Sequence, residues 1–194
     1  MATLALAADK KRPRSLARTV FLDESGFLLI PNLNRTRAPQ GQTPYCPVWY
    51  KQGRVNAFNA VVVSPQRKRV ALYVQFHRRT LRGEEVVEFL QPLLHPLRGP
   101  LVLLWDRDPI HRRKLVQDFL HRRPRVHLDY FPAYVPELNP AEYVWNRAND
   151  ALAHGTPRNE HELTRRLRSS MSKLKASQSF LWSCIYASDL PWSR

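Results

Sequence analysis

The chain has 194 residues, 43% of them hydrophobic, which suits one domain with a substantial core and argues against a disordered chain. Its 31 Lys and Arg residues outweigh 16 Asp and Glu residues, and the resulting formal net charge of +15 indicates a polyanionic partner. The two cysteines lie far apart, which argues against a zinc site, and no stretch approaches the roughly 18 apolar residues of a membrane span. We therefore expect a cytoplasmic protein that binds nucleic acid, with an arginine-rich coding bias as the plain alternative.

The first part of the chain predicts a strand between two irregular segments. Residues 1–18 form a basic leader that we expect to be disordered, with a DNA-contacting arm as the alternative. Residues 19–23 predict a first strand that ends at Ser25-Gly26. The segment 31–44 is crowded with Pro, Asn and Gly, which is typical of a long loop or an irregular hairpin.

The middle of the chain predicts a hairpin, a helix and a buried strand. Two runs rich in β-branched residues, 55–64 and 70–77, flank a short basic turn and predict a β-hairpin. Residues 83–97 have helical spacing, and Pro92 is expected to kink or shorten that helix. The five apolar residues 101–105 predict a buried strand.

The remainder predicts alternating helices and one more strand. We expect a basic amphipathic helix at 111–123, a strand at 126–131, a helix from Asn139-Pro140 to about His154, and a basic helix at 159–175 before an aromatic-bearing tail. The order of these elements predicts an α/β fold in which helices flank a mixed five-stranded sheet. We divide the chain into the leader 1–18, a core 19–157 and a C-terminal helical extension 158–194.

Three carboxylates are placed by two predicted strands and one predicted helix. Asp23 lies late in the first strand, and Asp106 directly follows the strand 101–105. Glu142 lies at the third position of a helix that Asn139 can cap. Because the carboxyl ends of central strands meet at one crevice, we expect these side chains to converge. Three hard oxygen donors suit two Mg²⁺ ions that act on phosphates.

Each acid also has a plainer interpretation. Glu142 could complete an Asn-x-x-Glu capping box with Asn139. Asp106 could be a loop acid after a strand, and Asp23 could begin a turn before Gly26. Taken singly, each plain interpretation is the more frequent outcome, because short motifs have many false positives. Taken together in a basic chain, the three acids favour a metal site.

Several other residues are candidates for auxiliary roles. Strand alternation should turn Glu24 to the face opposite Asp23, whereas Asp108 could approach the metals from its loop. His111 is a candidate to contact phosphate or to orient a ligand, with a surface position at a helix start as the alternative. A cluster of basic residues is the candidate surface for the DNA backbone, although any single member could simply be solvated: Arg112, Arg113, Lys114, Arg122, Arg123 and Arg125.

The motifs FLDESGF, WDRDPIHR and YFPAYVPELNPAEYVWN, with TRAPQGQTP between the first two, resemble the catalytic domain of a DDE transposase. The resemblance is strongest to the bacterial insertion-sequence branch of the mariner-like superfamily, the IS six-thirty group. It covers about residues 19–150 in the right order. The 35 residues between Asp106 and Glu142 are a spacing typical of that group.

The resemblance implies an RNase H-like fold and a dependence on Mg²⁺ or Mn²⁺, with two ions per site. By motif position, Asp23, Asp106 and Glu142 correspond to the metal-binding triad of the family. The implied activity is hydrolysis at the ends of an insertion sequence, followed by attack of the freed 3′-hydroxyl on target DNA. The implied partners are DNA and a second copy of the chain, and the implied location is the bacterial nucleoid.

The sequence departs from the family pattern in three places. Arg107 and Asp108 follow the second acid where small or polar residues are usual, and Arg37 stands where the family commonly has Trp. The leader is also too short for the N-terminal helix-turn-helix of the family, so we expect a separate or frameshift-fused subunit to recognise the element ends. A structure-directed nuclease of the same fold and an inactive, DNA-binding transposase remnant are the alternatives.

Overall fold

The computed structural model describes residues 17–29, 39–42, 53–152 and 157–190. The predictions for the leader, except its last two residues, and for most of the loop at 31–44 lie outside these ranges.

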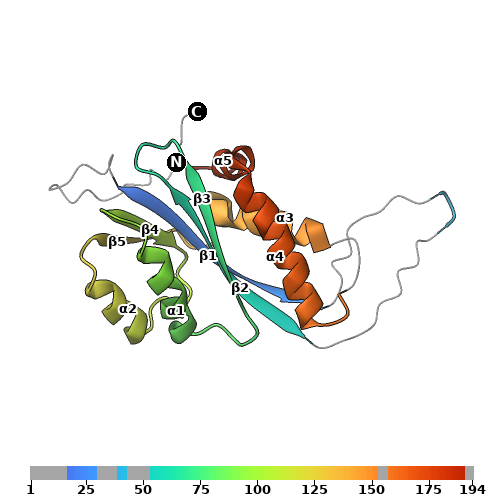
Figure 1. Cartoon of the computed structure of the whole chain (residues 1–194), viewed down its shortest axis with the longest axis horizontal. Coiled ribbons are helices and arrows are strands. Elements are labelled where there is room, and N and C mark those ends of the chain that lie inside the picture. Colours follow the sequence, from blue (N-terminus) through green and yellow to red (C-terminus); the bar gives the residue numbers. More distant parts are fainter. Residues whose placement is uncertain (1–16, 30–38, 43–52, 153–156, 191–194) are drawn as a thin grey trace.

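Within the described ranges, the strands form one five-stranded mixed sheet in the order β3-β2-β1-β4-β5 (Figure 1). β1 pairs antiparallel with β2, and β2 pairs antiparallel with β3. β4 is parallel to both β1 and β5. This arrangement confirms the predicted α/β fold. The strands are β1 (Arg18–Leu28), β2 (Arg54–Val63), β3 (Val70–His77), β4 (Leu101–Trp105) and β5 (Val126–Tyr130).

β1 is longer than the sequence indicated. The predicted end at Ser25-Gly26 is wrong, because these residues pair with Ala57 and Asn56 of β2 and the strand continues to Leu28. Gly26 therefore lies within the strand rather than in a turn, and the exposed guanidinium of Arg54 lies over it.

The helices follow the predicted order with changed boundaries. The helix predicted at 111–123 begins only at residue 114, because the preceding segment forms turns in which Asp108 accepts from the backbone N–H of Ile110. Pro92 lies inside α1, which ends three residues before the predicted residue 97. The aromatic-bearing tail forms a further helix. The helices are α1 (Gly83–Leu94), α2 (Lys114–His121), α3 (Pro140–Leu152), α4 (Glu160–Ala176) and α5 (Gln178–Ala187), with a 3-10 turn η2 (Pro136–Leu138).

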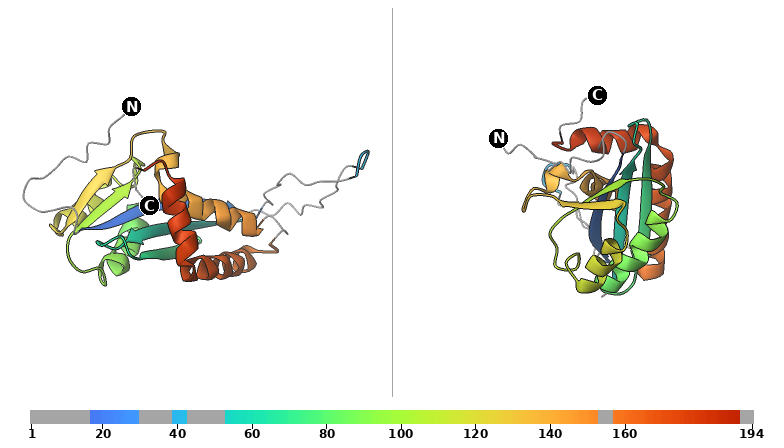
Figure 2. Two further views of the ribbon diagram at one scale, coloured as in Figure 1. Left: turned by 90° about the horizontal axis from the view of Figure 1, so that it is seen from above. Right: turned by 90° about the vertical axis from the view of Figure 1, so that its left-hand side faces the viewer.

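The helices cover both faces of the sheet and create two cores (Figures 1 and 2). α1 and α2 pack on one face with Val20 and Leu22 of β1, and α3, α4 and α5 pack on the other with Phe21. Each buried Leu, Val or Phe contributes roughly 1.5–3 kcal/mol to the stability of this arrangement. Side chains alternate along a strand, so Asp23 lies on the α3–α5 face and Glu24 on the α1–α2 face.

α3 is fixed against β1 by the aromatic residue that follows its acidic first turn. Trp145 is 2% exposed and makes an edge contact with Phe27, with ring centroids 5.5 Å apart. Trp145 therefore anchors α3 in the core. No helix of the described ranges combines the length and hydropathy needed to cross a membrane.

Candidate active site

Asp23 is a buried carboxyl near the middle of β1. It is 7% exposed, and its Oδ2 atom has no hydrogen-bond partner among the described residues. Burial raises the pKa of Asp23 well above its usual range, and repulsion from Glu142, Glu24 and Asp106 raises it further. A buried acid in this setting is costly unless a cation compensates its charge.

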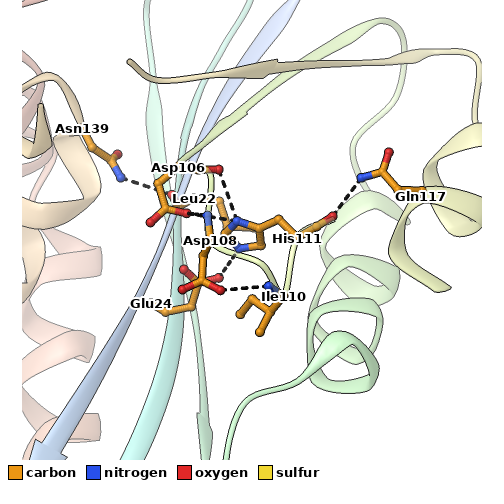
Figure 3. Close-up of polar contacts among 8 residues, drawn as sticks. All are labelled: Leu22, Glu24, Asp106, Asp108, Ile110, His111, Gln117 and Asn139. Carbon is orange, nitrogen blue, oxygen red and sulfur yellow. Dashed lines mark hydrogen bonds and ion pairs between the residues drawn. The ribbon is translucent and has the colours of Figure 1, made fainter. Parts of the chain in front are cut away.

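Asp106 is the first exposed residue after the five buried residues of β4. Its Oδ1 atom accepts from the backbone N–H of Asp108 at 2.9 Å and lies 3.1 Å from Nδ1 of His111 (Figure 3). Burial acts to raise the pKa of Asp106, but these hydrogen bonds outweigh it and lower the pKa below the usual value. Asp106 is therefore held in one orientation and ionised.

Glu142 lies in the first turn of α3, whose start is tied to β1. Asn139 accepts from the backbone N–H of Ala141 at 3.1 Å and donates through Nδ2 to the carbonyl oxygen of Leu22 at 3.2 Å (Figure 3). The reciprocal capping contact of Glu142 does not form in the described part of the chain, because the backbone N–H of Asn139 donates to Pro136 instead. The Glu142 carboxylate therefore remains available to the site.

The structure brings Asp23, Asp106 and Glu142 together from two strands and a helix. Burial raises the pKa of Glu142, and repulsion from Asp106 raises it further. Repulsion from Glu142 and from Asp106 also raises the pKa of Asp23. Such repulsion falls off with distance, so each acid lies within range of the charge of the others. The three carboxylates accumulate negative charge at the end of the sheet where β4 stops, and their catalytic role stays a prediction.

On the other face of β1, Glu24 forms an ion pair with a buried histidine. His111 is fully buried, so the alternative of a surface position is wrong. Its ring stacks on Trp105, with centroids 4.1 Å apart and planes 3° apart. Nε2 donates to Oε1 of Glu24 at 2.5 Å, while Nδ1 faces Asp106 (Figure 3). The imidazole therefore connects the first strand to the Asp106 carboxylate.

Electrostatics give this histidine a positive charge at neutral pH. Burial acts to lower the pKa of His111, but the hydrogen bonds to Asp106 and Glu24 raise it to about 10. Burial raises the pKa of Glu24, and the bond to His111 opposes that rise. One donor atom from each of Glu24, Asp106 and His111 lies within 4.8 Å of the others. Because a protonated imidazole has no lone pair for a metal, these three residues form an internal ion pair network.

Asp108, the predicted auxiliary acid, is exposed and shapes the loop. Its Oδ1 atom accepts from the backbone N–H of Ile110 at 2.8 Å, and its own N–H holds Asp106. Gln117 donates to the carbonyl oxygen of His111 at 2.8 Å and fixes the same loop to α2 (Figure 3). The structure thus gives Asp108 a clear part in orienting the loop after β4.

The predicted DNA-binding cluster divides into exposed residues and residues engaged by the fold. Arg125 donates to the carbonyl oxygens of Leu97 and Leu94 at 2.5 and 2.6 Å and closes the end of α1. Arg123 lies 3.6 Å from the Phe119 ring centroid and donates to the Phe119 carbonyl oxygen. The members with exposed side chains are Arg112, Arg113, Lys114 and Arg122.

Sequence reasoning missed the contact between Glu24 and His111, which are 87 positions apart. The available signal was the adjacency of Glu24 to Asp23 and of His111 to the loop after Asp106. Alternation placed Glu24 on the opposite face, as the two cores confirm, but did not identify what covers that face.

Comparisons with known proteins bear on the family and the fold of this chain. Residues 18–164 match the family model described as DDE superfamily endonuclease. No curated protein sequence matches the chain.

Solved transposase structures share the fold. The chain is similar to the Mos1 transposase paired-end complex with left transposon end, with a TM-score of 0.66, 19% identity and coverage of 88% of this chain and 52% of that one. For the Mos1 mariner paired end complex with Mn, the TM-score is 0.65 at 18% identity, over 91% of this chain and 53% of that one. The catalytic domain of Mos1 mariner transposase gives a TM-score of 0.58 at 16% identity, over 88% of this chain and 76% of that one.

The chain therefore spans about half the length of the first two structures. Likenesses at this level of identity establish the fold, and they confirm the predicted RNase H-like arrangement. The insertion-sequence branch within the family stays a prediction.

Proposed function

Because this chain belongs to the DDE superfamily endonucleases, we propose that it cleaves and rejoins DNA strands at the ends of an insertion sequence. Asp23, Asp106 and Glu142 are the proposed metal-binding and catalytic residues. One observation carries the proposal: among the described residues, the carboxylates of Asp23 and Glu142 approach Asp106 without an ion-pair partner of their own.

The residues present fit a divalent cation. Asp23 has a buried oxygen without a hydrogen-bond partner among the described residues, and the neighbouring acids repel it. Carboxylate oxygens are the donors that Mg²⁺ and Mn²⁺ prefer. One similar structure is described as a complex with Mn. We propose Mg²⁺ or Mn²⁺, with two ions per site, held by Asp23, Asp106 and Glu142.

A divalent metal bound there would supply Lewis acidity for the attacking and leaving oxygens at a phosphodiester. The chain's own residues prepare the acids for it. His111 and the N–H of Asp108 keep Asp106 ionised at neutral pH, and Asn139 holds the start of α3 against β1. Burial and mutual repulsion raise the pKa values of Asp23 and Glu142 without metal, and cation binding would favour their ionised forms.

The basic charge of the chain supports DNA as the substrate. The exposed side chains Arg112, Arg113 and Lys114 follow directly after the His111 loop, where they can contact phosphates beside the acids. Metal at the acids would also reduce their repulsion of the DNA backbone. We further propose that two copies act together on DNA at the nucleoid. We also propose that a helix-turn-helix subunit, separate or fused by frameshifting, takes part in recognising the element ends.

A cleavage assay tests the proposal on duplex DNA that carries the ends of the element, with and without Mg²⁺. We expect Asp106→Asn and Asp23→Asn each to reduce strand cleavage below detection, because each removes a metal-binding charge. Non-specific DNA binding should remain largely intact. Asp118→Asn, an exposed acid on α2, is the matched control and should cleave like the unmodified chain. Activity that survives Asp106→Asn would contradict the assignment.

The products separate this function from its alternatives. Strand transfer into a second duplex supports a transposase, whereas cleavage without joining favours a structure-directed nuclease. Salt-dependent DNA binding without Mg²⁺-dependent nicking would identify an inactive remnant.

A further inference from the structure

A hollow of about 570 Å³ lies at the β3 edge of the sheet, away from the three acids. Val55 of β2 and Phe76 of β3 contribute apolar lining. Phe76 also packs against the core on the α3–α5 face, so its ring is not a free stacking surface. The remaining lining is mostly basic, and it comes from the segment after β3 and from the first half of α4.

The spacing of basic residues on α4 directs them to one side of the helix. His161, Arg165 and Arg168 follow one another at intervals of four and three residues, which places them on one helical face. Arg78 approaches from the end of β3, with its NH2 atom 2.9 Å from Nδ1 of His161. Two chain segments thus present basic groups to the same hollow.

These basic groups lack acidic partners within the described residues. Arg165 and Arg168 have neither an ion pair nor a hydrogen-bonded side-chain partner there. The acid in the lining, Glu162, is engaged by Arg166 at 2.6 Å and by the backbone N–H of Arg158 at 2.8 Å. By contrast, Arg79, next to Arg78, pairs with acids on α1. The hollow is therefore a site of uncompensated positive charge.

The hollow and the acids lie at the same end of the sheet. β1, β3 and β4 run in the same direction, because β1 and β3 are each antiparallel to β2, and β4 is parallel to β1. Arg78 directly follows β3, and Asp106 directly follows β4. Three strand spacings, about 14 Å, separate those strands. The strand register also offsets Arg78 from Asp106 by four residues along the strands, about 13 Å, so the two positions are about 20 Å apart. One DNA strand carries a phosphate about every 3.4 Å along the axis, so this span corresponds to about six phosphates.

We propose that this hollow binds the phosphate backbone of duplex DNA beside the segment that reaches the three acids. The proposal rests on the proposed function, which makes DNA the substrate. Arginine guanidinium groups suit phosphate oxygens, and the absence of a free aromatic ring in the lining favours backbone contact over base stacking. The hollow would position DNA without taking part in the reaction.

Fluorescence anisotropy with a labelled duplex, over a series of salt concentrations, tests the hollow in the full chain. We compare Arg165→Gln/Arg168→Gln with Arg147→Gln/Lys173→Gln, a control with the same change of charge at exposed positions outside the hollow. Each lost phosphate contact reduces the slope of log K against log salt by about 0.9, so the hollow variant should lose about 1.8. The control should keep the slope of the unmodified chain.

Arg78→Gln tests the same site from a different segment of the chain and should reduce the slope by about 0.9. If the α4 variant does not fold, Arg78→Gln decides the question alone. In the cleavage assay, hollow variants should raise KM and leave kcat unchanged. If the hollow variants keep the slope of the unmodified chain, the hollow does not bind DNA, and the proposed function is unaffected. If the hollow variants lower the slope but the unmodified chain shows no Mg²⁺-dependent cleavage, the proposed function is wrong and the hollow remains a DNA-binding site.

Discussion

Asp23 and Glu24 are neighbours in the sequence with opposite electrostatic surroundings. Both are carboxyls whose pKa is raised by burial. Glu24 faces the protonated ring of His111 at 2.5 Å on the α1–α2 side. Asp23 faces the α3 side, where Glu142 repels it and no basic side chain of the described residues pairs with it.

The difference shows how one strand can serve both stability and chemistry. The charge of Glu24 is compensated within the fold, so this side of β1 is complete without a ligand. The charge of Asp23 has no such partner among the described residues, and we propose that a cation from solution compensates it. Asp106 connects the two sides, because it accepts from His111 and repels Asp23.

The largest expected effect comes from removing one partner of the buried ion pair. Glu24→Gln should lower the free energy of unfolding by about 3 kcal/mol, because it leaves the buried imidazolium of His111 with Asp106 as its remaining acid. Asp23→Asn should raise the free energy of unfolding in metal-free buffer, since it removes a repelled charge. Urea denaturation measures both. The exposed Glu137→Gln is the control and should change stability by less than about 0.5 kcal/mol. Destabilisation by Asp23→Asn would show that its charge is compensated after all.

A pH series without metal should show the ion pair being lost at high pH. The folded-state pKa of His111 is raised to about 10, above its ordinary value of 6.5, so the imidazolium adds stability that is fully present below pH 6.5. That stability should decline as the pH rises towards 10. Above that pH the neutral ring still donates one hydrogen bond, so the contact is weakened rather than removed. In His111→Gln, the free energy of unfolding should change little with pH between 6.5 and 10. The same decline in that variant as in the unmodified chain would refute the interpretation.

The smallest expected effect is stabilisation by Mg²⁺. At ten times its dissociation constant, an ion that binds only the folded chain adds about 1.4 kcal/mol. Thermal unfolding should show this gain in the unmodified chain and in Glu24→Gln, but not in Asp23→Asn. A gain in Asp23→Asn but not in Glu24→Gln would place the metal at Glu24, Asp106 and His111 instead of at the three predicted acids.

The pattern of nearby residues predicted the elements whose boundaries those residues mark. The apolar run of β4 gave its boundaries and placed Asp106 at its end. The end of β1 was wrong because Ser25 and Gly26 are turn formers in isolation, whereas pairing with β2 keeps them extended. The buried position of His111 depends on Trp105 and Glu24, and the latter lies far away in sequence.

By itself, the sequence determined the α/β element order and the positions of Asp106 after β4 and Glu142 in the first turn of α3, because the end of β4 and the start of α3 are marked by nearby residues. Only the tertiary structure decided which acid is compensated. The partner of Glu24 arrives through the parallel pairing of β1 with β4, and the repulsion on Asp23 arrives through α3 docking on the opposite face. Electrostatic pairing depends on distances in space, and those distances are set by packing between segments that the sequence leaves far apart.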